Sequence, residues 1–133
     1  MPPLALEVSL SDSYDEAVEK VIDALKSEGF GILTRIDVDA TLKEKLDVEF
    51  RPYVILGACN PPLAHRALQN EARVGVMLPC NVTVEQREND VLVAIANPDT
   101  MMRMPPLDQS AGLIEVAAEA KAKLERVVQK LEA

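Results

Sequence analysis

Five short stretches of the chain have the pattern of strands, either a hydrophobic and polar alternation with a period of two or a short apolar run. These stretches are residues 4–10, 30–38, 52–59, 82–86 and 91–96. In the second stretch the alternation predicts one shared face for Phe30, Ile32, Thr34, Ile36 and Val38. The third stretch is apolar on both faces, which predicts a central strand. A turn at Asn89-Asp90 separates the last two stretches, so the sequence favours a hairpin there.

Apolar residues recur every three to four positions in other segments, which is the spacing of one helical face. The predicted helices cover residues 14–28, 39–46, 61–72 and 110–131. Gly29 ends the first helix by permitting a left-handed residue. Asn60 is predicted to cap the third helix, with Pro61 in its first turn. The predicted inward-facing residues of that helix are Leu63, Ala64, Ala67 and Leu68. Residues 98–109 carry three prolines and predict a loop.

The order of these segments is strand, helix, strand, short helix, strand, short helix, two strands and long helix. The hairpin makes the sheet partly antiparallel, and residues 39–46 are short for a crossover between parallel strands. We therefore expect an α+β fold, with a mostly antiparallel sheet of about five strands, two long helices on one face and short inserted helices. The length of 133 residues predicts a single domain over residues 1–133.

Acidic residues outnumber basic ones by 22 to 14, which gives a net charge of −8. Residues 1–50 carry most of the excess, with 12 acidic and 5 basic residues. An acidic surface repels phosphate backbones, so we expect no nucleic-acid partner. The chain shows neither an apolar run of membrane-spanning length nor a basic-then-apolar leader, so we expect a cytoplasmic protein without membrane contact.

Cys59, His65 and Cys80 are the only thiols and the only imidazole in the chain. Thiolate and imidazole bind zinc, and thiolate with methionine thioether binds copper(I), so these residues are candidate metal ligands. Their spacing matches no compact zinc finger, and the helical periodicity turns His65 away from the apolar face of its helix. Two interpretations stay open: structural cysteines with a surface histidine, or a thiol or metal site.

Two further patterns bear on ligand binding. Pro61 and Pro62 remove two N–H groups from a helix start, and the five glycines form no phosphate-binding loop, so nucleotide binding is disfavoured. Residues 101–104 hold three methionines around Arg103. Such a flexible apolar cluster suits a pocket lining, a soft-metal contact or a subunit interface.

Residues 55–61, ILGACNP, and residues 63–68, LAHRAL, resemble the domain-of-unknown-function 302 family. Residues 77–84, MLPCNVTV, and the Asn97-Pro98 turn share this resemblance. It implies a core of strand, helix, four strands and helix, similar to the TATA-box-binding-protein-like fold, and a protein that forms dimers. It implies no established activity and carries over no catalytic residue. The positions that its motifs mark are Cys59, Asn60, Pro61 and Cys80.

These observations favour a homo-oligomeric module, a dimer by the resemblance, that binds a small molecule or a protein partner without catalysis or a cofactor of its own. We expect its site at the end of the central strand, where Cys59, Asn60 and Cys80 converge. The methionine-rich residues add Met102 to this site. The alternative hypothesis is a thiol- or metal-dependent protein that uses Cys59 and Cys80, with His65 as a further candidate ligand.

Overall fold

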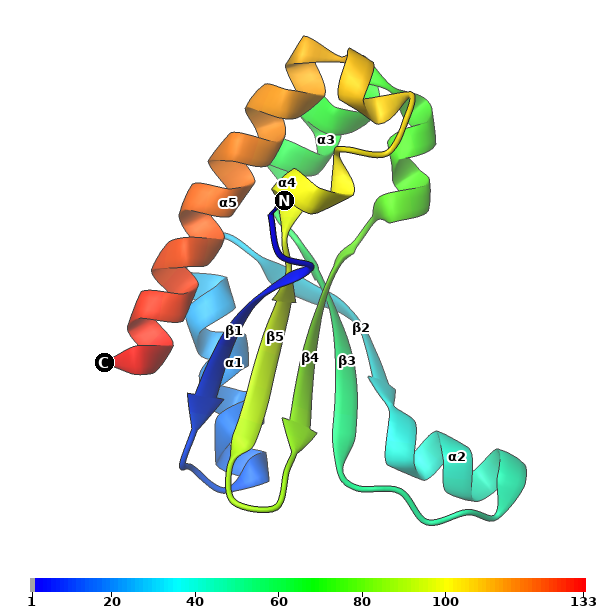
Figure 1. Ribbon diagram of the computed structural model, residues 1–133, viewed down its shortest axis with the longest axis vertical. Helices are drawn as coiled ribbons and strands as arrows, with labels where there is room; N and C mark the ends of the chain where they lie inside the picture. Colours follow the sequence, from blue (N-terminus) through cyan, green and yellow to red (C-terminus); the bar gives the residue numbers. More distant parts are fainter. Residues whose placement is uncertain (1) are drawn as a thin grey trace.

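Five strands form one antiparallel sheet in the computed structural model, which describes residues 2–133 (Figure 1). The strands are β1 (Ala5–Leu10), β2 (Gly31–Asp37), β3 (Tyr53–Cys59), β4 (Cys80–Gln86) and β5 (Val91–Ala96). Their order across the sheet is β1-β5-β4-β3-β2, and each neighbouring pair is antiparallel. The predicted α+β fold and the predicted hairpin of the last two strands are confirmed.

Two long helices, α1 (Tyr14–Ser27) and α5 (Ala111–Glu132), pack on one face of the sheet (Figure 1). Alternate strand residues point to this face and form the main core with the apolar stripes of both helices. Among the described residues, no helix covers the opposite face (Figure 1). The shorter helix α2 (Val38–Leu46) buries none of its residues and projects from the end of β2 as an arm.

The helix α1 begins and ends where its sequence indicates. The Ser13 hydroxyl accepts a hydrogen bond of 3.3 Å from the Glu16 amide, which satisfies one of the free N–H groups at the helix start. Gly29 has a φ of 86°, the left-handed conformation that glycine adopts without strain. A Cβ at this position would also lie 2.9 Å from the Asn60 side-chain nitrogen, so the close approach requires glycine for a second reason.

Four short helices lie beyond one end of the sheet, at the top of Figure 1. They are α3 (Pro61–Asn70), α4 (Pro98–Met101) and the 3-10 helices η1 (Ala72–Met77) and η2 (Leu107–Gln109). Together with the first half of α5 they enclose a second hydrophobic core, and we refer to this group as the helical cap. The helix α5 therefore contributes to both cores, the cap with its first half and the sheet with its second half.

The prediction of one shared face for the second strand is wrong. The pairing of β2 with β3 shifts between Ile32 and Thr34, so a bulge lies at this point. Ile32 pairs with Ala58 on the core side, whereas Ile36 pairs with Ile55 on the uncovered side. A bulge adds one residue to a strand and thereby moves the following side chains to the other face. Val38 no longer belongs to the strand and begins α2.

Three boundaries also differ from the sequence predictions. The predicted loop at residues 98–109 contains α4 and η2, because an asparagine cap can start a helix at Pro98 despite the prolines that follow. The third predicted helix ends at Asn70 and gives way to η1. Leu4 precedes β1 and is exposed.

Asn97 provides a test of how the cap is joined to the sheet. Its fully buried side chain accepts a hydrogen bond of 3.1 Å from the Asp99 amide and donates one of 3.1 Å to the Pro3 carbonyl. We expect Asn97→Ala to lower the free energy of unfolding by about 2 kcal/mol, since buried partners are left unsatisfied. Urea denaturation of this variant beside Asn81→Ala, which truncates an exposed asparagine on β4, measures the difference. Equal stability of the two variants would contradict the structural role.

Candidate functional site

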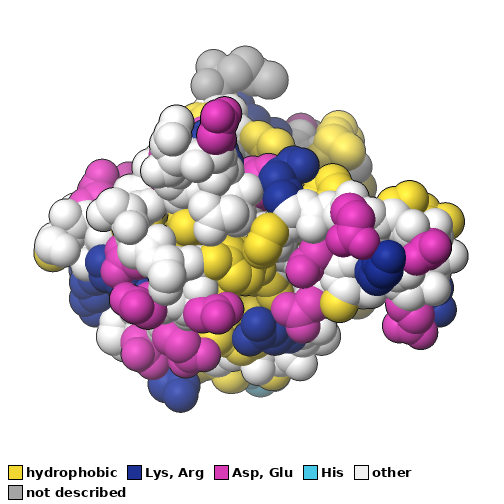
Figure 2. Space-filling view, turned by 90° about the horizontal axis from the view of Figure 1, so that it is seen from below, with side chains coloured by type: hydrophobic (Ala, Val, Ile, Leu, Met, Phe, Trp, Pro, Cys, Tyr) yellow, Lys and Arg dark blue, Asp and Glu magenta, His cyan; other side chains and the backbone are white. Residues whose placement is uncertain are grey.

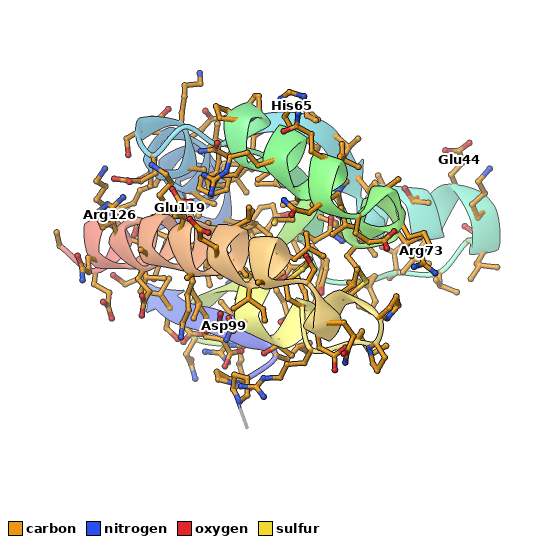
Figure 3. The ribbon with its side chains drawn as sticks, turned by 90° about the horizontal axis from the view of Figure 1, so that it is seen from above. Glu44, His65, Arg73, Asp99, Glu119 and Arg126 are labelled. Carbon is orange, nitrogen blue, oxygen red and sulfur yellow. The ribbon has the colours of Figure 1, made fainter. Side chains whose placement is uncertain are left out.

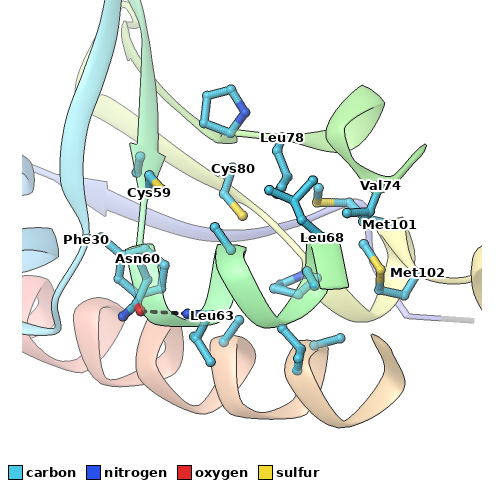
Figure 4. A pocket seen from close by; sticks show the side chains of 18 of the residues that line it. Phe30, Cys59, Asn60, Leu63, Leu68, Val74, Leu78, Cys80, Met101 and Met102 are labelled. Atoms are coloured by element: carbon cyan, nitrogen blue, oxygen red, sulfur yellow. Dashed lines mark hydrogen bonds between the residues drawn. The ribbon is translucent and has the colours of Figure 1, made fainter. Parts of the chain in front are cut away.

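An apolar cavity of about 310 Å³ lies between the end of the sheet and the helical cap (Figure 4). It opens where the two hydrophobic cores meet, so residues of both cores contribute to its wall. The lining residues are Phe30, Leu33, Ala58, Cys59, Asn60, Leu63, Ala64, Ala67, Leu68, Val74, Leu78, Pro79, Cys80, Pro98, Met101, Met102, Leu113, Val116, Ala117 and Ala120. No Lys, Arg, His, Asp or Glu is among them.

Two Asn-Pro pairs start the helices that border the cavity. The strands β3 and β5 are both antiparallel to β4, so they run parallel to each other and finish at the same end of the sheet. Asn60 follows β3 and caps α3, and Asn97 follows β5 and caps α4. Both asparagines are buried. At this end of the sheet, the chain therefore passes twice from a strand into a short helix of the helical cap.

The predicted site residue Asn60 lines the cavity, but its side chain has structural partners. The side-chain oxygen of Asn60 accepts a hydrogen bond of 3.3 Å from the Leu63 amide in the cavity wall (Figure 4). Its side-chain nitrogen donates a hydrogen bond of 3.4 Å to the Glu28 carbonyl at the end of α1. These two bonds fix the direction in which α3 leaves the sheet and leave Asn60 little capacity to bind a ligand.

The thiols of Cys59 and Cys80 lie at the end of β3 and the beginning of β4, and both line the cavity (Figure 4). Cys80 pairs directly with Ala58, so the two cysteines are one position apart in the register. Both are free thiols. Burial, and to a smaller extent the nearby Cys59, raises the pKa of the Cys80 thiol to about 11. Cys80 is therefore neutral at physiological pH and a weak nucleophile.

His65 does not join the cysteines. It lies on the exposed side of α3 and points away from α5 in Figure 3, as the helical periodicity indicated. It is absent from the cavity wall. Within residues 2–133, no three His, Cys, Asp or Glu side chains are grouped so that they could hold a metal ion.

The methionine-rich segment contributes Met101 and Met102 to the wall, whereas Met104 is exposed. Met102, the fourth predicted site residue, is buried and packs in the second core. Two thioethers and two thiols thus line one cavity (Figure 4). Thioether side chains are flexible, so this part of the wall can change its shape.

Most of the lining was not identifiable from the sequence as part of a site. Leu68, which periodicity predicts to face inward, is 43% exposed and still reaches the cavity. Leu33 at the bulge is 68% exposed and also contributes. The remaining residues that the prediction missed are apolar side chains such as Phe30, Val74 and Val116, which a sequence pattern cannot distinguish from ordinary core.

Charged residues surround the cavity in pairs on the outer surface. Arg66 on α3 contacts Glu119 on α5 at 2.6 Å, and Lys121 contacts Asp99 at 3.1 Å. Glu119 and Asp99 lie on the outside of the helices in Figure 3. The Arg66 guanidinium lowers the pKa of the Glu119 carboxyl through their hydrogen bond. These pairs link the helices of the cap and leave the interior without charge.

The fold and this cavity define a class of protein: a small α+β domain in which a helical cap encloses an apolar cavity at one end of an antiparallel sheet. The chain belongs to the family described as domain of unknown function DUF302, whose model matches residues 6–131. The structural similarity covers the whole domain. The crystal structure of an uncharacterized conserved protein DUF302 from Bacillus stearothermophilus matches with a TM-score of 0.87 and 30% sequence identity, over 98% of this chain and 99% of that chain.

No curated protein matches the chain. The resemblance to the TATA-box-binding-protein-like fold stays a prediction. Within residues 2–133, no helix has the length and apolar character to cross a membrane.

The raised pKa of Cys80 predicts slow alkylation. In a Cys59→Ser variant, where Cys80 is the single thiol, we expect its rate with iodoacetamide at pH 8 to be about 100-fold below that of the urea-unfolded variant, since its thiolate forms near pH 11 instead of the ordinary 9.0. The rate should rise tenfold per pH unit towards pH 11. A rate that levels off near pH 9 would show an ordinary thiol.

Proposed function

We propose that this protein is a binding module that holds a small apolar molecule in the cavity beneath the helical cap, without chemistry of its own. The observation that carries the proposal is the cavity itself. Protein interiors are packed to the density of organic crystals, with few voids larger than a water molecule. This cavity opens to solvent beside Leu33 and Leu68, so its apolar wall faces water unless a molecule covers it.

A bound apolar molecule would fill this space and remove the apolar wall from water, which is favourable by about 25 cal/mol per Å² of apolar surface. The chemistry of the wall supports binding without turnover, since its lining has no ionisable acid or base besides the two thiols and Cys80 is protonated. The two free thiols support the cytoplasm as the compartment in which this binding takes place.

A neutral fluorescent probe tests this proposal. N-phenyl-1-naphthylamine should bind the protein with one site and a dissociation constant in the micromolar range, seen as a saturable rise in fluorescence. Ala117→Phe fills the cavity from α5, so we expect it to weaken binding by at least about tenfold. Ala118→Phe adds the same ring to the exposed side of the same helix and serves as the control.

Circular dichroism of both variants shows whether they fold, and Ala64→Leu supplies a milder change of the same wall if Ala117→Phe does not. Equal probe binding in the Ala117 and Ala118 variants would show that the probe binds elsewhere. The competing hypothesis, a thiol- or metal-dependent protein, makes a different prediction. Native mass spectrometry of protein purified without chelator would then show a metal-sized increment that is lost in Cys59→Ala or Cys80→Ala.

The expected self-association is part of the same proposal, and the α2 arm supports it. The arm and the residues that follow it expose Leu46, Val48 and Phe50, and the uncovered sheet face beside it exposes Ile36. In the view from below, Figure 2 shows hydrophobic side chains among charged ones at this end of the molecule. Residues 35–51 carry 4 basic and 5 acidic side chains, so two copies that meet there avoid most of the repulsion between chains of charge −8.

We expect a dimer in native mass spectrometry and sedimentation at micromolar concentration. Leu46→Lys combined with Val48→Lys should convert it to a monomer, because charges would be buried in an apolar contact. Val76→Lys, at a residue 87% exposed on the helical cap, is the matched control and should leave the dimer intact. A wild-type protein that remains monomeric at about 100 µM would overturn the proposed self-association.

A further inference from the structure

The cavity lacks the groups that recognise a negatively charged molecule. None of its lining residues carries a positive charge, and two cations of the helices that border it have acidic partners, Arg66 with Glu119 and Lys121 with Asp99. A helix that begins at a cavity can nevertheless bind an anion through the free N–H groups of its first turn. Whether these groups are available decides which ligands the cavity accepts.

The helix α3 offers no such group. Pro61 and Pro62 have no N–H, the Leu63 amide donates to the Asn60 side-chain oxygen at 3.3 Å, and the Ala64 amide donates to the Asn60 carbonyl at 2.9 Å. Every backbone donor of the first turn is thus absent or already bonded. Asn60 and the two prolines leave the start of this helix without a site for an anion.

The helix α4 repeats this arrangement. Pro98 has no N–H, the Asp99 amide donates to the Asn97 side chain at 3.1 Å, and the Thr100 amide donates to the Asn97 carbonyl at 3.1 Å. The first residue of α5 in the cavity wall, Leu113, donates its amide to the Ser110 hydroxyl at 3.2 Å. Each helix that borders the cavity is therefore capped from within the protein.

The polar side chains of the wall, apart from the thioethers, are two thiols and one asparagine. Asn60 is committed to α3 and to the Glu28 carbonyl. A thiol is a weak donor and acceptor, and the raised pKa of Cys80 shows that its surroundings disfavour charge. An ionised carboxylate or phosphate that entered this cavity would lose its hydration without gaining a partner.

We propose that the cavity selects uncharged apolar molecules and rejects the carboxylate or phosphate of the same hydrocarbon skeleton. This inference rests on the proposed function and adds the chemical class of the ligand. A neutral hydroxyl or carbonyl group is tolerated, since it can bond a thiol and costs far less to remove from water than an ion. The selection arises from capped helix starts as much as from apolar side chains.

A matched pair of compact ligands tests the selection. 2-Naphthalenemethanol and 2-naphthoate share one ring system, and their rigid shape keeps the polar group close to the rings. We expect the alcohol to displace N-phenyl-1-naphthylamine at pH 7.5 at least about 100-fold more effectively than the carboxylate, because the carboxylate is desolvated without a partner. The affinity of the acid should rise tenfold for each unit by which the pH falls towards its pKa, since only the protonated form enters.

A pair of variants separates the cavity wall from the general charge of the protein. Ala64→Lys places a cation in the wall and should raise naphthoate affinity at pH 7.5 at least about tenfold. His65→Lys adds the same charge one residue further along, on the exposed side of α3, and should change neither ligand's affinity.

The outcomes of these measurements are distinguishable. Naphthoate that binds wild-type protein as tightly as the alcohol, with no dependence on pH, would overturn the selection while the proposed function stands. Failure of the probe and of both ligands to bind would overturn the proposed function and the selection with it. Preferential binding of the alcohol, reduced by Ala64→Lys and unaffected by His65→Lys, supports the selection.

Discussion

The buried asparagine caps at the ends of β3 and β5 are the constraint on which the rest of the molecule depends. Each one satisfies the first free N–H group of a helix and bonds a carbonyl that is distant in sequence, Glu28 for Asn60 and Pro3 for Asn97. A polar side chain without partners would destabilise the interior, so these bonds fix one direction for each departing helix. The helical cap lies at the end of the sheet because α3 and α4 both begin where these two strands end.

Glu28 links this arrangement to the long helices. Its backbone carbonyl accepts from Asn60, and its carboxylate accepts hydrogen bonds from Lys130 and Arg126 on α5 at 2.7 and 2.9 Å. These bonds, first that of Lys130 and then that of Arg126, lower the pKa of the Glu28 carboxyl. The turn from α1 into β2 is thereby held against α3 and α5 together, and Phe30 just beyond it lines the cavity.

The cavity follows from how α5 is shared between two cores. Its second half packs on the sheet and its first half packs in the cap, so the helix crosses the gap between them as a rigid rod. Small side chains face this gap from α3 and α5, among them Ala64, Ala67, Ala117 and Ala120. The side chain of Asn60, which caps the start of α3, holds this helix in place. The helical cap therefore cannot collapse onto the end of the sheet, and the space between them remains. The same bonds that fix the helices also occupy the donors that an anion would need.

The sequence alone determined the α+β class, the five strands, the four longest helices and the convergence of Cys59, Asn60, Cys80 and Met102 on one region. Local rules suffice for these features, because apolar periodicity, caps and the hairpin turn act over a few residues. The apolar stripe of α5 is the clearest case: at helical spacing it comprises Leu113, Ala117, Ala120, Leu124, Val127, Val128 and Leu131, all buried except for the partly buried Val128.

Only the tertiary structure decided the bulge in β2, the helix within residues 98–109 and the bond from Asn60 to the Glu28 carbonyl. A bulge depends on how one strand pairs with its neighbour, and this pairing is not encoded in the strand's own alternation. The Asn97 side chain caps α4 locally, and its second bond, to the Pro3 carbonyl 94 positions away, fixes this cap against the start of the chain's first strand. The cavity is likewise a property of assembled elements, since Phe30, Val74 and Val116 have the same apolar character whether they fill a core or line a space. Contacts between residues far apart in the sequence determine the bulge and whether an apolar residue fills a core or lines a cavity. The local pattern of hydrophobic and polar residues does not specify such contacts.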